Sequence, residues 1–221
     1  MKTITKLVLV LVASLTRAAM GEESSVLDRW RTRFDIGGSL PENPTLSEIG
    51  GPVTSGDEME LSAGIQFDFA LGYRVTPWLT LEGEMSFSLN EVDSVGNWSY
   101  PDSALLQMSL MFNVEFNYPR WPLVPFAGIG AGGVLSSLSF GMYDYYYSES
   151  DGEAADFVPA AQVFAGLRYE FNKQWSLGVT YRFLATASQD WDVEWWDGAE
   201  FDLGVDRVCI HSFCLVFSGS F

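Results

Sequence analysis

Nine charged residues lie in stretches of the chain where polar and apolar residues alternate, always on the polar side of the alternation. Carboxylates and guanidiniums that share a closed interior must pair, because an unpaired buried charge is costly. A cluster of this kind forms either a structural plug or the gate of a narrow ion path, and we favour the plug. The nine residues are Arg33, Asp68, Arg74, Glu82, Glu84, Glu115, Arg168, Glu170 and Arg182. The contacts expected first join Arg168 and Arg182 to Glu82, Glu84 and Glu115.

His211 is the only histidine, so any hydrolase that uses a Ser–His pair would depend on it. On a β-strand, a serine on the same face would stand two residues away, where the chain has Phe213. Ser212 lies on the opposite face. Cys209 shares the face of His211, but no neighbouring residue in the sequence would activate its thiol. We therefore expect no enzymatic activity.

Four polar segments, residues 41–57, 90–103, 141–157 and 185–206, are rich in acidic residues and contain no Lys or Arg. Segments of this composition suit a basic partner or a divalent cation. Asp190, Asp192 and Glu194 alternate along the last segment but lack the glycine of a calcium loop, so we expect no metal and no cofactor. A solvated surface is the simpler interpretation, and an extracellular ligand of the acidic loops stays open.

The stretch from Met59 to Val75 shows how these residues are positioned. Its odd positions are apolar or small, as in Phe67 and Leu71, and most of its even positions are polar, as in Gln66 and Asp68. This alternation predicts a β-strand with one apolar face. The predicted strand is longer than the usual five to six residues and reaches the roughly 9–11 residues that cross a bilayer. It therefore predicts a transmembrane β-barrel.

The same alternation predicts seven further strands, over residues 31–40, 79–89, 104–118, 124–140, 157–171 and 175–183 and from about 209 to the end of the sequence. Short turns at 76–78, 119–122 and 172–174 join strands at one end, and the four acidic segments join them as long loops at the other. We expect an all-β fold, an eight-stranded antiparallel up-and-down transmembrane β-barrel with short periplasmic turns and four long acidic external loops. Gly128, Gly130 and Gly132 share one strand face and would give long side chains from facing strands room inside.

The composition narrows the functional classes. Residues 1–21 resemble a signal peptide, with Lys2 and Lys6 before a short apolar core, and residues 22–221 form the predicted barrel domain. Removing the signal leaves nine basic against 29 acidic side chains. Nucleic acid is not an expected partner, because phosphate binding needs clustered Lys and Arg. No later segment has the 18 unbroken apolar residues of a membrane-spanning helix.

Alternation alone does not say which face points into the barrel, and a soluble lipocalin-like barrel would turn its apolar face inward. Two features favour lipid outside. From the second strand on, the apolar face carries no Asp, Glu, Lys or Arg, and His211 is its one ionisable outlier. Four tryptophans also gather at the short-turn end, as in an interfacial aromatic girdle. They are Trp30, Trp78, Trp121 and Trp175.

The segment from Pro125 to Gly132 and the pattern from Phe213 to Phe221 resemble the eight-stranded outer-membrane barrels of the opacity-protein and outer-membrane-protein-A type. The resemblance spans the mature chain, but its motifs define a fold more than a function. It implies that the terminal aromatic residue, here Phe221, is the signal that the outer-membrane assembly machinery recognises. The ending Ser218-Gly219-Ser220-Phe221 departs from the more usual Tyr-x-Phe.

The expected function is that of a non-enzymatic bacterial outer-membrane barrel, with outer-membrane lipid as its surroundings and a lumen plugged by ion pairs. It would have a structural or surface-interaction role through its external loops. Three alternatives stay open: a small-solute channel, a lipid-A-modifying hydrolase built on His211, and a soluble lipocalin-like ligand-binding barrel.

Overall fold

The computed structural model describes residues 29–49, 56–96, 98–118, 122–142, 150–172, 174–194 and 200–221, and the predicted signal peptide lies outside them. The described residues form twelve strands. They are β1 (Trp30–Pro41), β2 (Leu46–Ile49), β3 (Met59–Leu61), β4 (Gly64–Thr76), β5 (Leu79–Val95), β6 (Trp98–Asn117), β7 (Leu123–Met142), β8 (Ser150–Glu170), β9 (Trp175–Thr186), β10 (Gln189–Glu194), β11 (Glu200–Val205) and β12 (Cys209–Ser220). In this part of the chain, no helix is long and apolar enough to cross a membrane.

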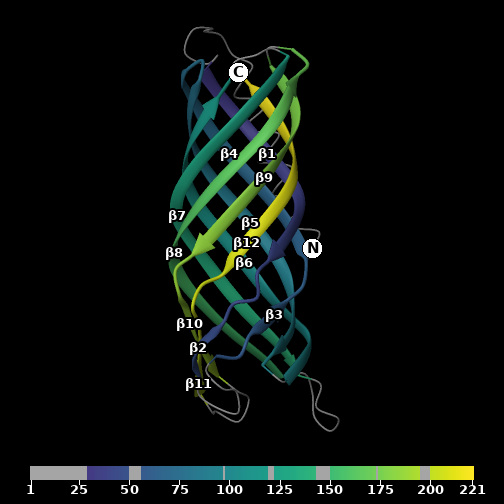
Figure 1. The fold of residues 1–221 in the computed structure, drawn as a ribbon, viewed down its shortest axis with the longest axis vertical. Helices are drawn as coiled ribbons and strands as arrows, with labels where there is room; N and C mark the ends of the chain where they lie inside the picture. Colours follow the sequence, from purple (N-terminus) through teal and green to yellow (C-terminus); the bar gives the residue numbers. More distant parts are fainter. Residues whose placement is uncertain are drawn as a thin grey trace.

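Eight of the strands close into an antiparallel up-and-down barrel, as predicted (Figure 1). They follow the order β1, β4, β5, β6, β7, β8, β9 and β12 around the barrel. The first and last strands pair along their whole length, from Arg31 opposite Ser220 to Pro41 opposite Ile210, and this pairing closes the barrel. All the backbone groups in the wall can therefore bond to neighbouring strands, without a free edge.

The two ends of the barrel differ. One end, here called the turn end, holds the tight turn at Pro77-Trp78, the bend near Asn172, the start of β1 and the end of β12. The opposite end, here called the hairpin end, holds the four short strands β2, β3, β10 and β11 (lower part of Figure 1). The long strands β5 to β8 run into this end.

The apolar face of the barrel strands points outward, as predicted. Phe67, Leu110 and Val179 are 37%, 56% and 55% exposed. The polar residues that alternate with these apolar residues point into the barrel and are buried, as are Gln66, Ser109 and Thr180. The lipocalin-like alternative is therefore wrong, because its apolar side chains would converge on the interior.

The predicted strand from Met59 to Val75 is wrong at its beginning. The chain leaves the strand conformation at Ser62 and Ala63, which separates β3 from β4. Met59 and Leu61 are buried, whereas Ile65, also odd-numbered, is 51% exposed. The facing of the side chains thus reverses across this break, because Met59 and Leu61 pack into an apolar core at the hairpin end.

The four predicted long loops are also wrong in part, because much of their sequence is strand. β5 and β6 extend through residues 90–103 and meet at a turn where Gly96 has a φ of 59°. β7 and β8 extend into the third segment. The remaining residues of that segment, 143–149, lie outside the described part of the chain. β2 lies in the first segment and pairs with β11, which with β10 occupies the fourth. Short strands thus continue the barrel wall at the hairpin end.

The interior has two layers. Buried polar and charged side chains fill it toward the turn end, and a cluster of 18 buried apolar residues fills it toward the hairpin end. The apolar layer includes Leu105 from β6, Leu138 from β7 and Trp191 from β10, all fully or almost fully buried. The charged groups therefore occupy only the layer toward the turn end, and the hairpin end is packed like a soluble protein core.

Candidate functional site

The charged layer is the largest group of chemically active side chains in the described residues. We call it the lumen cluster, and each member is at most 4% exposed. Its members alternate along β1, β4, β5, β6, β8 and β9, so that they point to the barrel axis from most of the wall. They are Arg31, Arg33, Asp35, Asp68, Glu82, Glu84, Glu115, Arg168 and Arg182.

The part of the lumen cluster nearer the turn end is organised around Glu115 of β6. Arg31 donates to both carboxylate oxygens of Glu115, at 2.8 and 2.9 Å, and Arg168 donates to Oε1 at 3.1 Å. Arg31 also donates to Glu82 Oε1 at 2.8 Å, while Arg33 donates to Glu82 Oε2 at 2.7 Å. Two glutamates and the guanidiniums around them thus form one hydrogen-bonded group.

The other part is organised around Glu84 of β5. Its Oε1 accepts from Arg182 at 2.5 Å and from Gln162 at 3.0 Å. Its Oε2 accepts from Asn113 at 2.9 Å and also from Arg33. Arg182 also forms ion pairs with two aspartates, with Nη1 3.2 Å from Asp68 Oδ2 and Nη2 3.5 Å from Asp35 Oδ2. Glu84 therefore has donors for both oxygens, whereas the two aspartates share Arg182.

An aromatic ring packs against the cluster from β8. Phe164 lies under the guanidiniums of Arg33 and Arg182, 5.4 and 5.9 Å from the ring centroid. Gly128 of β7 leaves the space this ring needs, because a Cβ there would lie 2.3 Å from Phe164 Cζ. Gly130 likewise gives space to Asn113, as predicted for the glycine face, but a Cβ at Gly132 would strike the backbone of β6.

The structure brings together seven of the nine charged residues that the sequence singled out. Arg74 and Glu170 lie at the margin, half-buried, and Glu170 reaches Arg168 only at 4.0 Å. Sequence reasoning missed Arg31 and omitted Asp35 from the site. Both have the same odd-numbered parity as Arg33 on β1, so the signal was available in the alternation.

His211 lies on the outer surface near the hairpin end, 33% exposed. Its Nδ1 is 2.7 Å from the hydroxyl of Tyr181, and its Nε2 is 3.0 Å from Glu42 Oε1. The hydrogen bond from His211 lowers the pKa of Glu42 below its usual value. The hydroxyl of Ser212 points inside and donates to Gln66, so the neighbouring serine cannot serve His211.

Three of the four predicted girdle tryptophans are described, and all three lie at the turn end. Trp30 packs against Tyr73, Trp78 against Phe116 and Trp175 against Phe217, with ring centroids 5.3, 6.3 and 5.2 Å apart. Trp121 lies outside the described residues. The terminal Phe221 donates its backbone N–H to the carbonyl of Trp30 at 3.0 Å, which holds the end of the chain beside the start of β1.

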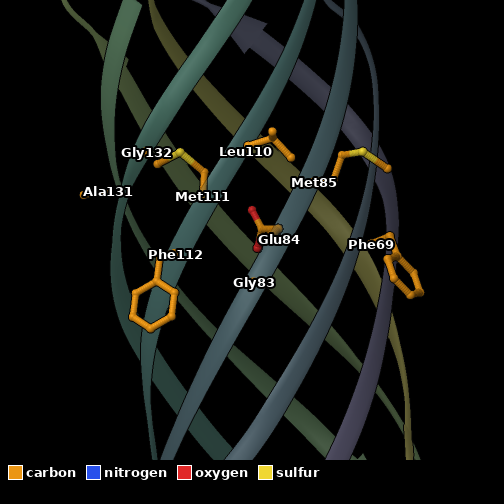
Figure 2. Close-up of a pocket in the computed structure, with 9 residues that line it drawn as sticks. All are labelled: Phe69, Gly83, Glu84, Met85, Leu110, Met111, Phe112, Ala131 and Gly132. Atoms are coloured by element: carbon orange, nitrogen blue, oxygen red, sulfur yellow. The ribbon is translucent and has the colours of Figure 1, made fainter.

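A shallow apolar groove interrupts the outer surface of the barrel at strands β4 to β7 (Figure 2). It forms around Gly83 of β5, where a Cβ would meet no atom within 4 Å. The side chains of Phe69, Met85, Leu110 and Phe112 surround it. Behind it, Glu84 is held by its four hydrogen-bond donors, so the described residues show a surface depression and no path into the lumen.

Acidic side chains are exposed on the outer wall of the hairpin end. They include Glu58 and Glu60 beside β3 and Glu91 and Asp93 on β5. Within the described residues, no group of three or more His, Cys, Asp or Glu is placed to hold a metal ion. The geometry thus offers a negatively charged surface at this end.

Comparisons with known proteins agree with this architecture. The family model described as "Outer membrane protein beta-barrel domain" matches residues 7–207. No curated protein matched the sequence.

Among solved structures, the outer membrane protein OprG from Pseudomonas aeruginosa is 10% identical, with a TM-score of 0.56, covering 87% of this chain and 97% of its own. AlkL, solved in DMPC lipid bilayers, is 18% identical, with a TM-score of 0.55, covering 91% and 94%. The outer membrane protease OmpT from Escherichia coli is 11% identical, with a TM-score of 0.54, covering 90% and 99%. At these identities the likeness concerns the fold alone.

Proposed function

The chain belongs to the outer membrane β-barrel family and is a transmembrane protein of the bacterial outer membrane. From that premise we propose that it is a sealed, non-enzymatic barrel that presents its hairpin end to the cell exterior. The filled interior is the observation that carries this proposal. Charged side chains fill one layer of the lumen, and apolar side chains fill the next. Both layers contain side chains that are completely buried, such as Glu115 and Leu105. A solute would have to displace both layers, so the small-solute channel is the weaker alternative.

The surface of the hairpin end supports a role in contacts outside the membrane. Glu58, Glu60, Glu91 and Asp93 are exposed there, and Arg207 is the one exposed basic residue among the described residues of this end. Charge of one sign favours partners of the opposite sign and speeds their encounter. The proposed role is therefore the binding of a basic surface or polypeptide, and lipid surrounds the apolar belt between the two ends.

The hydrolase built on His211 has less support. His211 is engaged by Tyr181 and Glu42, and Ser212 is bonded inside the lumen. A Ser–His hydrolase needs the hydroxyl within hydrogen-bond reach of the histidine, and this arrangement lacks it.

Binding to charged surfaces tests the proposed role. Protein folded in nanodiscs should bind immobilised polylysine at low salt, lose this binding as salt is added, and ignore immobilised dextran sulfate. A variant with Glu58→Gln, Glu60→Gln, Glu91→Gln and Asp93→Asn should bind polylysine more weakly. The control is Glu170→Gln, which removes an acidic charge at the opposite, turn end. Equal binding by all three proteins would contradict the proposal.

A further inference from the structure

The lumen cluster does not balance its own charge. Within the described residues it holds five carboxylates, from Asp35, Asp68, Glu82, Glu84 and Glu115, and only four guanidiniums. Arg74 and Glu170 at its margin cancel each other. One negative charge is therefore in excess inside a space closed to water, where an uncompensated charge costs several kcal/mol.

The excess can be located from the contacts. Arg31 and Arg168 face Glu82 and Glu115, two charges against two. On the other side, Arg182 contacts three carboxylates, those of Asp35, Asp68 and Glu84. Arg33 bridges the two sides, because it contacts Asp35 and Glu84 as well as Glu82 and Glu115. Glu84 receives donors on both oxygens, which suits an ionised carboxylate. The excess charge therefore belongs to the two aspartates.

Asp35 and Asp68 each have an oxygen without a donor. Asp35 Oδ1 and Asp68 Oδ2 are buried and accept no hydrogen bond, although Arg182 lies near Asp68 Oδ2. The two residues stand directly opposite each other on β1 and β4, and both side chains point into the lumen. Directly opposed like charges on neighbouring strands repel each other. Two carboxylates that cannot both ionise can share one proton.

We propose that Asp35 and Asp68 bind one exchangeable proton between them, so that the sealed lumen carries no net charge. This inference deepens the proposed function, since it concerns the same plugged lumen. A protonated carboxyl supplies the donor that the pair lacks, and a second oxygen of the pair can accept it. The described residues offer no cluster for a metal ion, which favours a proton as the missing positive charge.

The other titratable groups around the pair are accounted for. Arg33 of β1 and Arg182 of β9 contact Asp35, Glu84 of β5 is held by its own donors, and Gln66 of β4 donates to Asp68 Oδ1 at 2.8 Å. Cys214 of β12 also lies within electrostatic range of both aspartates. A thiol is neutral in its protonated form and adds no positive charge.

Infrared spectroscopy of the folded protein in lipid vesicles tests the proposal. The wild type should show the C=O band of a buried protonated carboxyl at neutral pH, shifted by deuteration. The band should disappear in Asp35→Asn and in Asp68→Asn, because each amide removes the excess charge together with the shared proton. Ser218→Ala, which changes a buried inward hydroxyl without changing charge, should keep it. Absence of the band in the wild type, or its persistence in both aspartate variants, would overturn the proposal.

Folding equilibria give a second, independent readout. Because the folded state holds a proton that the unfolded chain has already lost, the folding constant of the wild type should fall tenfold per pH unit, relative to Asp68→Asn. This slope should begin above the ordinary pKa of an aspartate and end where the proton leaves the folded state. The Asp35→Asn/Asp68→Asn double variant leaves one arginine uncompensated and should lose about a hundredfold or more in folding constant. A wild-type stability that depends on sodium at constant ionic strength would instead reveal a bound metal ion and overturn the shared proton. A current through the barrel would contradict the plug itself, which separates the two failures.

Discussion

Arg33 makes more ion pairs than any other described side chain, and this centrality gives the first prediction. It contacts Asp35, Glu82, Glu84 and Glu115 from one position on β1. Arg33→Met should destabilise the barrel by about 3–5 kcal/mol, because it leaves buried carboxylates without a counter-charge. Urea unfolding in lipid vesicles measures the loss. Arg74→Met, at the half-exposed margin, is the control and should cost clearly less.

His211 and Glu42 give a second prediction for single residues. The hydrogen bond from His211 lowers the pKa of Glu42, so the contribution of Glu42 is present above its usual pKa and is lost as the pH falls through the lowered value. His211→Ala should return the pKa of Glu42 to the ordinary range for a glutamate. A titration of the Glu42 carboxyl by NMR, in the wild type and in the variant, checks this. An unchanged titration of Glu42 would show that another group sets its pKa.

The lumen residues show what sequence can predict at this scale. Alternation predicts which face of the sheet each side chain lies on. It therefore predicts that Arg31, two residues before Arg33, also points into the lumen. It does not give depth along the barrel axis, so Arg74 and Glu170 could not be told from the residues of the central cluster. The individual partners depend on the register between strands, which a single strand's pattern does not contain.

At the scale of elements, the closing seam between β1 and β12 gives a further prediction. Gly37 stands opposite Cys214, and a Cβ on Gly37 would lie 2.0 Å from the carbonyl oxygen of Phe213. Gly37→Ala should force these two strands apart and cost about 1–3 kcal/mol, as overpacking does. Unfolding in urea and the heat-dependent shift on a detergent gel both report it.

Gly83 of β5 is the matched control for this substitution. It also lies in a barrel strand, but a Cβ there would meet no atom within 4 Å. Gly83→Ala should therefore keep the stability of the wild type. Equal losses at the two positions would show that glycine flexibility, and not close strand contact, decides the effect.

The predicted loops failed for a physical reason that the elements make clear. Beyond the apolar belt, the outside of the wall faces water and the inside faces the apolar core. Glu58 and Glu60 are accordingly exposed and Met59 is buried, the reverse of the pattern in β4. A search of the sequence for strands with an apolar outer face therefore stops at the point where the outer surface of the barrel changes from apolar to polar. Glycine and acidic residues then make the remaining strand sequence resemble loops.

At the scale of the whole molecule, the two interior layers have different origins. The charged layer lies inside the part of the barrel whose outer face is apolar, where polar interiors are usual. The apolar layer lies where both faces of the wall would otherwise meet water, and there a hydrophobic core stabilises the short strands. Length and alternation correctly predicted the barrel and the outward facing of its apolar side chains. They could not predict the second layer, because its residues come from ten strands that are far apart in the sequence.

The ion current through folded protein in a planar lipid bilayer tests the central claim most directly. The claim is that the charged and apolar layers together seal the barrel. Preparations whose folding is verified by the heat-dependent gel shift should give no steady conductance steps at neutral pH. Regular steps from such preparations, suppressed or altered by Arg33→Met, would show an open path through the lumen cluster and contradict the account.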